Sequence, residues 1–148
     1  MNSLPKLGDR MLVIFDGHCV FCNGAVRWFM RRDRHDRLRF AASESVNVAA
    51  LLARHRSTVA NAEDGPNTIL LVRDFGGSAE VLLVRSNAAL AMLRELPQPW
   101  PAVAAALRLI PRALRDLGYR LIARWRYRIW GRLESCPLPT AEERKSFL

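Results

Sequence analysis

The sequence predicts an α/β fold in which helices flank a four-stranded mixed sheet, and three observations predict it. The run Met11–Phe15 is continuously apolar, as in a strand that is covered on both faces. Apolar residues then recur at helical spacing from Val20 onward, with Asn23 on the opposite, polar side. Two further apolar runs, "TILLVRD" and "EVLLVRS", lie on either side of "FGGSA", which is typical of a β-hairpin with Gly76-Gly77 in the turn.

The remaining elements follow from the same periodicity. "LRFAAS", Leu38 to Ser43, is a second short strand, and "ESVNVAALLARH" is a helix capped near Ser43 or Ser45. Ser86 is expected to be the N-cap of a third helix, "NAALAMLREL", which Pro97 ends. The order strand, helix, strand, helix, strand, strand, helix is that of a thioredoxin-like core.

Length and composition indicate one globular domain. The chain has 148 residues, 50% of them hydrophobic and 25% charged, so we expect a single thioredoxin-like domain over residues 1–148. Its core is expected at about residues 11–97 and a helical extension at about 100–139. The first ten residues lack the apolar segment of a signal peptide, and no apolar run approaches the roughly 18 to 20 residues of a membrane span. We therefore expect a reducing, cytoplasmic setting.

The C-terminal third is strongly basic, with eight arginines and one aspartate between Trp100 and Arg132. "WPAVAAALRLIPRALRDL" predicts two short helices that begin near Pro101 and Pro111. "YRLIARWRYRIWG" fits a helix, although its alternation also fits a strand. We expect a helical cap that packs its aromatic side chains onto the sheet and turns its arginines outward. The alternative is a basic amphipathic surface for peripheral contact with a membrane or a partner, and no recognised motif supports specific nucleic-acid binding.

Two of the three cysteines, Cys19 and Cys22, lie at the predicted junction of the first strand and the first helix. Sites form at this edge of open α/β sheets, and under reducing conditions a CxxC pair is typically redox-active or metal-binding. Two intervening residues in a helical turn bring the sulfurs within bridging distance. Cys19 would lie among the free amides of the helix N-terminus, which favour a thiolate, and Cys22 would be more sheltered. Cys19 is therefore expected to attack and Cys22 to resolve.

The neighbours of the pair have roles that the sequence leaves open. Asp16 either exchanges the proton of the resolving thiol or accepts hydrogen bonds from amides of the turn. His18 either favours the thiolate when protonated or is an exposed loop residue. Val20 and Phe21 are expected to form a hydrophobic rim suited to an apolar disulfide partner. We expect no metal or other cofactor, because zinc would need four ligands and the sequence has no second CxxC or His-x-His pair.

The motif "DGHCVFC" resembles the signature of the DCC family of predicted thiol-disulfide oxidoreductases, named for the pattern Asp-x-x-Cys-x-x-Cys. "RSNAAL", around Ser86 and Ala88, is similar to the family's Ser-x-Ala helix start. The C-terminal block is similar to that of the family over matching positions, which are Asp116, Tyr119, Arg126, Trp130-Gly131 and Cys136. The resemblance covers about residues 11–139, with Trp125 and Trp130 where the family commonly has Asn and Phe.

The resemblance implies a thiol-disulfide oxidoreductase, which we expect to be of the protein-disulfide reductase type, while the sequence leaves open whether it reduces, oxidises or isomerises disulfides. Its substrate would be a disulfide-containing protein or a small thiol, and its electron donor is not indicated. The alternative is a non-catalytic thioredoxin-fold binding module that uses the CxxC pair for a metal or the basic face for docking. Cys136 is expected to be buried and inert, the alternative being a third thiol that exchanges with the pair.

Thioredoxins carry a cis-proline directly before the third strand, and this chain departs from that pattern. Here Pro66 precedes Asn67 and Thr68. Either Pro66 takes the cis role through a longer bend, or Thr68 faces the cysteines without it.

Overall fold

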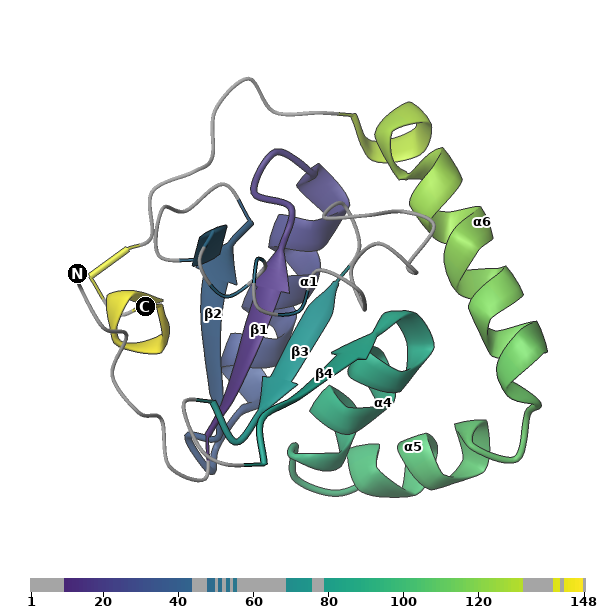
Figure 1. Cartoon of the computed structure of the whole chain (residues 1–148), viewed down its shortest axis with the longest axis horizontal. Coiled ribbons are helices and arrows are strands. Elements are labelled where there is room, and N and C mark those ends of the chain that lie inside the picture. Colours follow the sequence, from purple (N-terminus) through teal and green to yellow (C-terminus); the bar gives the residue numbers. More distant parts are fainter. Residues whose placement is uncertain are drawn as a thin grey trace.

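The computed structural model of the chain describes residues 10–43, 48, 49, 51, 53, 55, 69–75, 79–131, 140, 141 and 143–147. Its four-stranded sheet consists of β1 (Met11–Phe15), β2 (Leu38–Ala42), β3 (Leu70–Arg73) and β4 (Val81–Val84), in the order β2-β1-β3-β4 (Figure 1). β1 is parallel to β2 and antiparallel to β3, and β3 pairs antiparallel with β4. The mixed, thioredoxin-like sheet and its hairpin are therefore confirmed.

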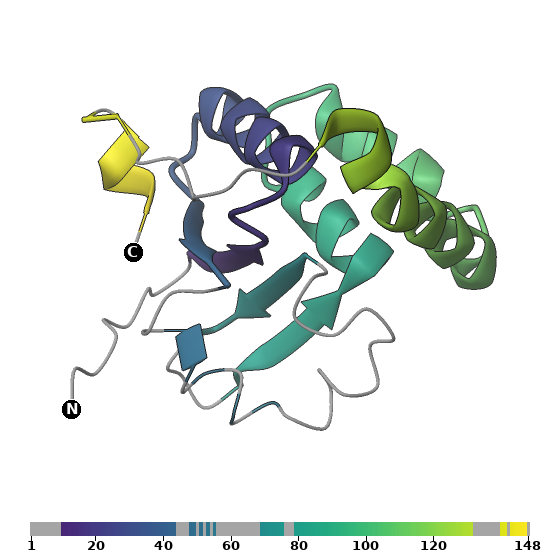
Figure 2. The ribbon, with the colours of Figure 1, turned by 90° about the horizontal axis from the view of Figure 1, so that it is seen from above.

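The helices are α1 (Val20–Arg32), α4 (Arg85–Arg94), α5 (Trp100–Leu107), α6 (Arg112–Trp130) and the short 3-10 helix η2 (Glu143–Ser146). α1 and α4 lie on the same face of the sheet, and α6 packs against both of them on the side away from the sheet (Figure 2). α5 packs against α4. Within the described residues, none of the helices combines the length and the apolar character needed to span a membrane.

β1 is buried along its whole length because both of its faces are covered. Met11, Val13 and Phe15 contact side chains of α1 and α4. Leu12 and Ile14 point to the other face, into a second core cluster that includes Val48 and Leu51 of the expected second helix. Residues 48, 49, 51 and 53 are helical and His55 is in a turn, while the other residues of that expected helix, like the Gly76-Gly77 turn, lie outside the described residues. Burial of each large apolar side chain stabilises the fold by about 1.5–3 kcal/mol, which explains the unbroken apolar run.

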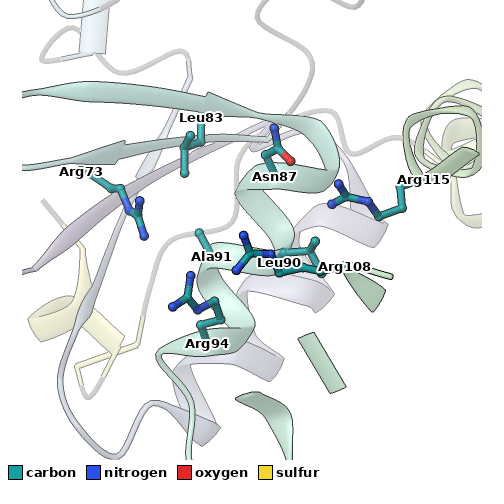
Figure 3. A pocket seen from close by; sticks show the side chains of 8 residues that line it. All are labelled: Arg73, Leu83, Asn87, Leu90, Ala91, Arg94, Arg108 and Arg115. Atoms are coloured by element: carbon teal, nitrogen blue, oxygen red, sulfur yellow. The ribbon is translucent and has the colours of Figure 1, made fainter. Parts of the chain in front are cut away.

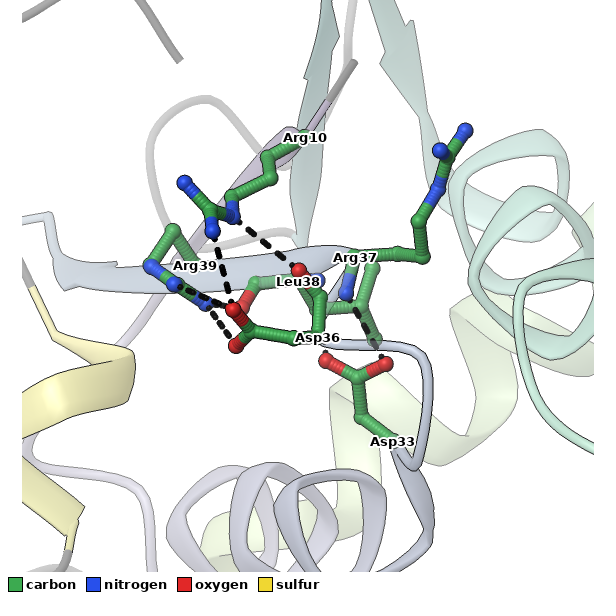
Figure 4. Close-up of polar contacts among 6 residues, drawn as sticks. All are labelled: Arg10, Asp33, Asp36, Arg37, Leu38 and Arg39. Carbon is green, nitrogen blue, oxygen red and sulfur yellow. Dashed lines mark hydrogen bonds and ion pairs between the residues drawn. The ribbon is translucent and has the colours of Figure 1, made fainter. Parts of the chain in front are cut away.

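The connection from α1 to β2 is held by the carboxylate of Asp33, which follows the last residue of the helix (Figure 4). Its two oxygens accept the backbone N–H groups of Arg37 at 3.0 Å and Leu38 at 2.9 Å. The helix end therefore fixes where the parallel strand begins.

Asp36, in the same connection, has a positive φ of 53° and is placed between two arginines (Figure 4). Arg39 contacts its carboxylate at 2.7 Å and Arg10 at 2.9 Å. The hydrogen bond from Arg39 is the largest cause that lowers the pKa of Asp36 to about 2, and Arg10 acts in the same direction.

Two helix boundaries differ from those expected. Ser86 is not the N-cap of α4, because Val84 leaves β4 in an extended conformation and the helix begins directly at Arg85. The first of the two expected short helices is α5, which begins beside Pro101, but the second continues through the segment expected as a separate helix or strand and forms one helix of 19 residues, Arg112–Trp130. Gly118 does not interrupt it, and the strand alternative is wrong.

The expectation that the C-terminal cap packs its aromatic side chains onto the sheet is also wrong. α1 and α4 lie between most of α6 and the sheet, and Tyr119 of α6 reaches the backbone of Ile69 just before β3. Trp125 is 40% exposed. Trp100, at the start of α5, contacts Trp28 of α1 with ring centroids 4.7 Å apart.

Candidate active site

Cys19 is the N-cap residue of α1 and directly follows the turn after β1, as the sequence predicted. Its backbone is extended, with φ −85° and ψ 119°, and its Sγ accepts the backbone N–H of Cys22 at 3.2 Å. Both cysteines are in the reduced, thiol form. The Cys19 Sγ therefore lies at the N-terminus of α1, in contact with an amide of the first helical turn.

Asp16 lies in the same turn and is 4% exposed. Its Oδ1 accepts the backbone N–H of His18 at 3.0 Å, and its carbonyl oxygen accepts the N–H of Cys19 at 3.3 Å. The structure thus brings Asp16, Cys19 and Cys22 together, with Asp16 in contact with an amide of the turn. His18 is half-buried and not the exposed loop residue of one sequence interpretation.

Asn23 is a site residue that the sequence interpretation missed, since helical periodicity put it on the polar side of α1. The residue is 7% exposed. Its Nδ2 donates to the carbonyl oxygens of Gly17 at 2.8 Å and Cys19 at 3.0 Å. The side chain therefore ties the loop before Cys19 to the first turn of the helix. The sequence signal that could have identified Asn23 is its amide side chain directly after the second cysteine.

The two cysteines are equally enclosed, at 0% exposed for Cys19 and 2% for Cys22. The expectation that Cys22 would be the more sheltered one is wrong. Both belong to the core cluster that also holds Phe15, Val26 and Ala88. Both thiols are therefore enclosed in the core that β1, α1 and α4 form together.

Phe21, between the two cysteines, is half-buried and does not form an open rim. Its ring packs against that of Trp130, the last residue of α6, with centroids 4.6 Å apart. The C-terminal end of α6 therefore covers the motif.

α6 is anchored by three of the residues on which the family resemblance depends. The hydroxyl of Ser86, in the first turn of α4, donates to the carboxylate of Asp116. The hydroxyl oxygen of Tyr119 accepts the backbone N–H of Ile69, just before β3, at 2.9 Å. These contacts position the helix that carries Trp130.

Some predicted features lie outside the described residues, namely Cys136, the bend with Pro66, Asn67 and Thr68, and the side chain of Arg126. The cis peptide bond found in the described part joins Gln98 and Pro99, between α4 and α5. In that same part, no three His, Cys, Asp or Glu side chains gather in a way that could hold a metal ion.

A strand–turn–helix junction that carries a CxxC pair on this sheet topology defines a thioredoxin-like protein with a dithiol site. The profile of the DCC1-like thiol-disulfide oxidoreductase family matches residues 13–132. The chain belongs to this family.

Two relatives extend the similarity over nearly the whole chain. A chloroplastic DCC family protein of Arabidopsis thaliana is 32% identical over 137 residues, which cover 93% of this chain and 74% of that protein. The protein YuxK of Bacillus subtilis (strain 168) is 29% identical over 143 residues, which cover 97% of this chain and 96% of YuxK. No solved structure matches the chain.

Proposed function

We propose that this protein is a thiol-disulfide oxidoreductase of the protein-disulfide reductase type, with Cys19 as the nucleophile and Cys22 as the resolving thiol. The observation that carries the proposal is the position of the Cys19 Sγ at the N-terminus of α1, where it accepts the N–H of Cys22. Membership of the family supports a redox role. The cytoplasmic setting expected from the sequence stays a prediction.

The reaction proceeds in two exchanges. The Cys19 thiolate attacks one sulfur of the substrate disulfide, whose S–S bond breaks, and the departing sulfur takes up a proton. The Cys22 thiolate then attacks the Cys19 Sγ, releases the second substrate thiol and forms the Cys19–Cys22 disulfide. The substrate gains two electrons and two protons, and the protein loses them. An external dithiol returns the pair to the reduced state.

Asp16 is the proposed acceptor of the Cys22 proton in the second exchange. Its burial in the turn that holds both cysteines supports this role, while its contact with the His18 amide equally supports a purely structural one. Asp16→Asn separates the two: as a proton acceptor it slows the second exchange more than the first, whereas a structural residue changes both equally or neither.

The enclosure of Cys19 makes access part of the mechanism. A disulfide must come into line with the attacking sulfur, which requires displacement of side chains above the helix start. Phe21 of α1 is half-buried and Trp130 of α6 is exposed. Their rings pack against each other and so connect the two helices. They are the cover that moves, and their apolar rings favour an apolar or unfolded disulfide substrate.

The test follows turnover of a protein disulfide with a chemical dithiol as reductant. Cys19→Ser abolishes activity, because it removes the nucleophile. Cys22→Ser accumulates a mixed disulfide between Cys19 and the substrate, which is visible by mass spectrometry. Full multi-turnover activity of Cys22→Ala would contradict the two-cysteine mechanism.

Thiol titration distinguishes this function from a metal-binding module. The redox function requires a reversible loss of two thiols on oxidation. Stoichiometric zinc bound to the reduced protein, with no such reversible loss, would instead assign the cysteines to a metal.

A further inference from the structure

Four arginines from separate elements line one hollow of about 280 Å³ (Figure 3). Arg73 ends β3, Arg94 ends α4, Arg108 follows α5, and Arg115 lies in the first turn of α6. The other lining residues are uncharged, and they are Leu83, Asn87, Leu90 and Ala91.

The positive charge of this hollow is not neutralised by the described part of the protein. No carboxylate among the described residues forms an ion pair with any of the four arginines, and no acidic side chain lines the hollow. Four guanidinium groups at close range repel one another, and bringing them together is unfavourable without a counterion. The arrangement therefore has the charge of an anion site.

Arg115 gives a second, independent indication that the hollow binds an anion. Its Nε donates to the carbonyl oxygen of Ile110 at 3.1 Å, which fixes the orientation of the guanidinium. Its Nη1 is buried and has no hydrogen-bond partner among the residues that the structure describes. Buried polar groups are normally paired, so an unpaired donor of a charged group marks a missing acceptor.

We infer that this hollow binds a compound that carries one or more phosphate groups. Guanidinium groups donate paired hydrogen bonds to phosphate oxygens, and several arginines converging on one space match a polyanion better than a single carboxylate. Leu83, Leu90 and Ala91 supply an apolar wall for the remainder of the molecule.

The site is separate from the cysteines. β3 runs antiparallel to β1, and Ile14 pairs with Leu70, so Arg73 lies toward the beginning of β1. Cys19 follows the opposite end of that strand. Failure of the redox proposal would leave this inference untouched.

Calorimetric titration of the full chain with inorganic pyrophosphate, at about 150 mM salt, tests it. Arg115→Gln weakens binding by about tenfold or more, because it removes a charge-assisted hydrogen bond. The matched control is Arg34→Gln, which removes the same charge from an exposed position outside the hollow and leaves binding within about twofold.

A second arm uses vesicles of phosphatidic acid in phosphatidylcholine, because a lipid headgroup offers the same phosphate chemistry. If Arg115→Gln weakens the binding of pyrophosphate alone, the site binds a soluble phosphate compound. If it weakens binding to the vesicles alone, the site binds a lipid headgroup. Equal behaviour of Arg115→Gln and Arg34→Gln in both arms, or no binding in either, overturns the inference.

A different observation carries a second inference. α6 exposes a row of large apolar side chains at helical spacing, with exposed fractions of 59% for Leu114, 51% for Leu117, 51% for Leu121, 40% for Trp125 and 65% for Ile129. Contiguous exposed apolar side chains on one helix mark an interaction surface.

The charged side chains of α6 indicate which kind of surface the apolar row contacts. α6 carries several exposed arginines, which are Arg112, Arg120, Arg124 and Arg128. Asp116 is the single acidic residue of the helix, and it already contacts Ser86 and Arg112. An apolar face with Trp and Leu beside a basic face is the pattern of a helix that lies in the interface of an anionic membrane.

We propose that α6 docks the protein peripherally on an anionic lipid surface. In this orientation the end of the helix at Trp130 brings the cysteine motif, through Phe21, close to the membrane. The apolar row enters the interface, and the arginines contact the headgroups.

Flotation with phosphatidylglycerol vesicles, with phosphatidylcholine vesicles for comparison, tests this proposal. Ile129→Glu weakens binding to anionic vesicles by about tenfold, whereas Val81→Glu, at a 48% exposed position on β4, changes it by less than about twofold. Equal binding by Ile129→Glu and the unaltered protein, or a concentration-dependent dimer that Ile129→Glu dissociates, overturns membrane docking.

Discussion

Asn23 is expected to hold the nucleophile loop in place, and Asn23→Ala tests this directly. The substitution removes the two hydrogen bonds from Nδ2 to the carbonyl oxygens of Gly17 and Cys19. The backbone bond from the N–H of residue 23 to the Cys19 oxygen, at 3.0 Å, remains. The change therefore isolates what the side chain contributes.

The magnitude follows from the two bonds. Each buried hydrogen bond contributes about 1 kcal/mol to the free energy of unfolding, so the side chain is worth about 2 kcal/mol. Ala is a better helix former than Asn by roughly 0.6 kcal/mol, which offsets part of this loss. We expect a net destabilisation of about 1.5 kcal/mol.

Asn87→Ala is the matched control, since Asn87 also lies in the first turn of a helix and donates no hydrogen bond that the structure shows. It gains the same helix propensity and loses nothing. The two variants should differ by about 2 kcal/mol in urea unfolding, or about 4–8 °C in Tm for a chain of this size.

A second measurement links stability to the site. The loosened loop exposes Cys19, so Asn23→Ala also accelerates alkylation of that thiol, and Asn87→Ala does not. If the two variants unfolded within about 0.5 kcal/mol of each other, the bonds from Asn23 would not hold the loop, and the reasoning would be refuted.

Three further outcomes are expected. Trp130→Ala uncovers Phe21 and raises the rate at which iodoacetamide alkylates the nucleophilic thiol; an unchanged rate would contradict a covering role. Tyr119→Phe leaves the N–H of Ile69 without its acceptor and lowers the free energy of unfolding by about 1–2 kcal/mol in urea titration. The depressed pKa of Asp36 contributes stability that is present above pH 3.8 and is lost as the pH falls through about 2. Asp36→Asn therefore flattens the dependence of the free energy of unfolding on pH in that window. If the profiles of the variant and the unaltered protein ran parallel there, the result would argue against the ion pairs.

Most of the fold was predictable because local patterns determine it. The unbroken apolar run of β1 predicted that the strand is buried on both faces. The hairpin of β3 and β4 was predicted from two apolar runs on either side of a glycine-containing turn. The start of α4 was not predictable in the same way. A serine is a strong capping residue by itself, but the extended Val84 passes directly into the helix and leaves Ser86 free to contact Asp116.

The candidate site was predicted as far as it depends on neighbouring residues. The placement of Cys19 at the helix N-terminus follows from spacing alone. The enclosure of both thiols does not, because it depends on α4, which begins more than sixty residues away in the sequence. Asn23 was missed for the same kind of reason. Periodicity assigns a polar residue to solvent, and only the path of the turn at Gly17 shows that its amide has buried partners.

The positions that support the family resemblance act together on one helix. Asp116 and Tyr119 do not touch the cysteines in any contact described above; they hold α6 against α4 and the start of β3. The same helix ends at Trp130, whose ring covers Phe21 between the two cysteines. A change at Tyr119 that loosens the helix should therefore alter the reactivity of Cys19 as well as stability. We expect Tyr119→Phe to accelerate alkylation of Cys19, and no further acceleration when Tyr119→Phe is added to Trp130→Ala, because both act through the same cover. Additive effects of the two substitutions would show that the anchors of α6 and the cover of the thiols are independent.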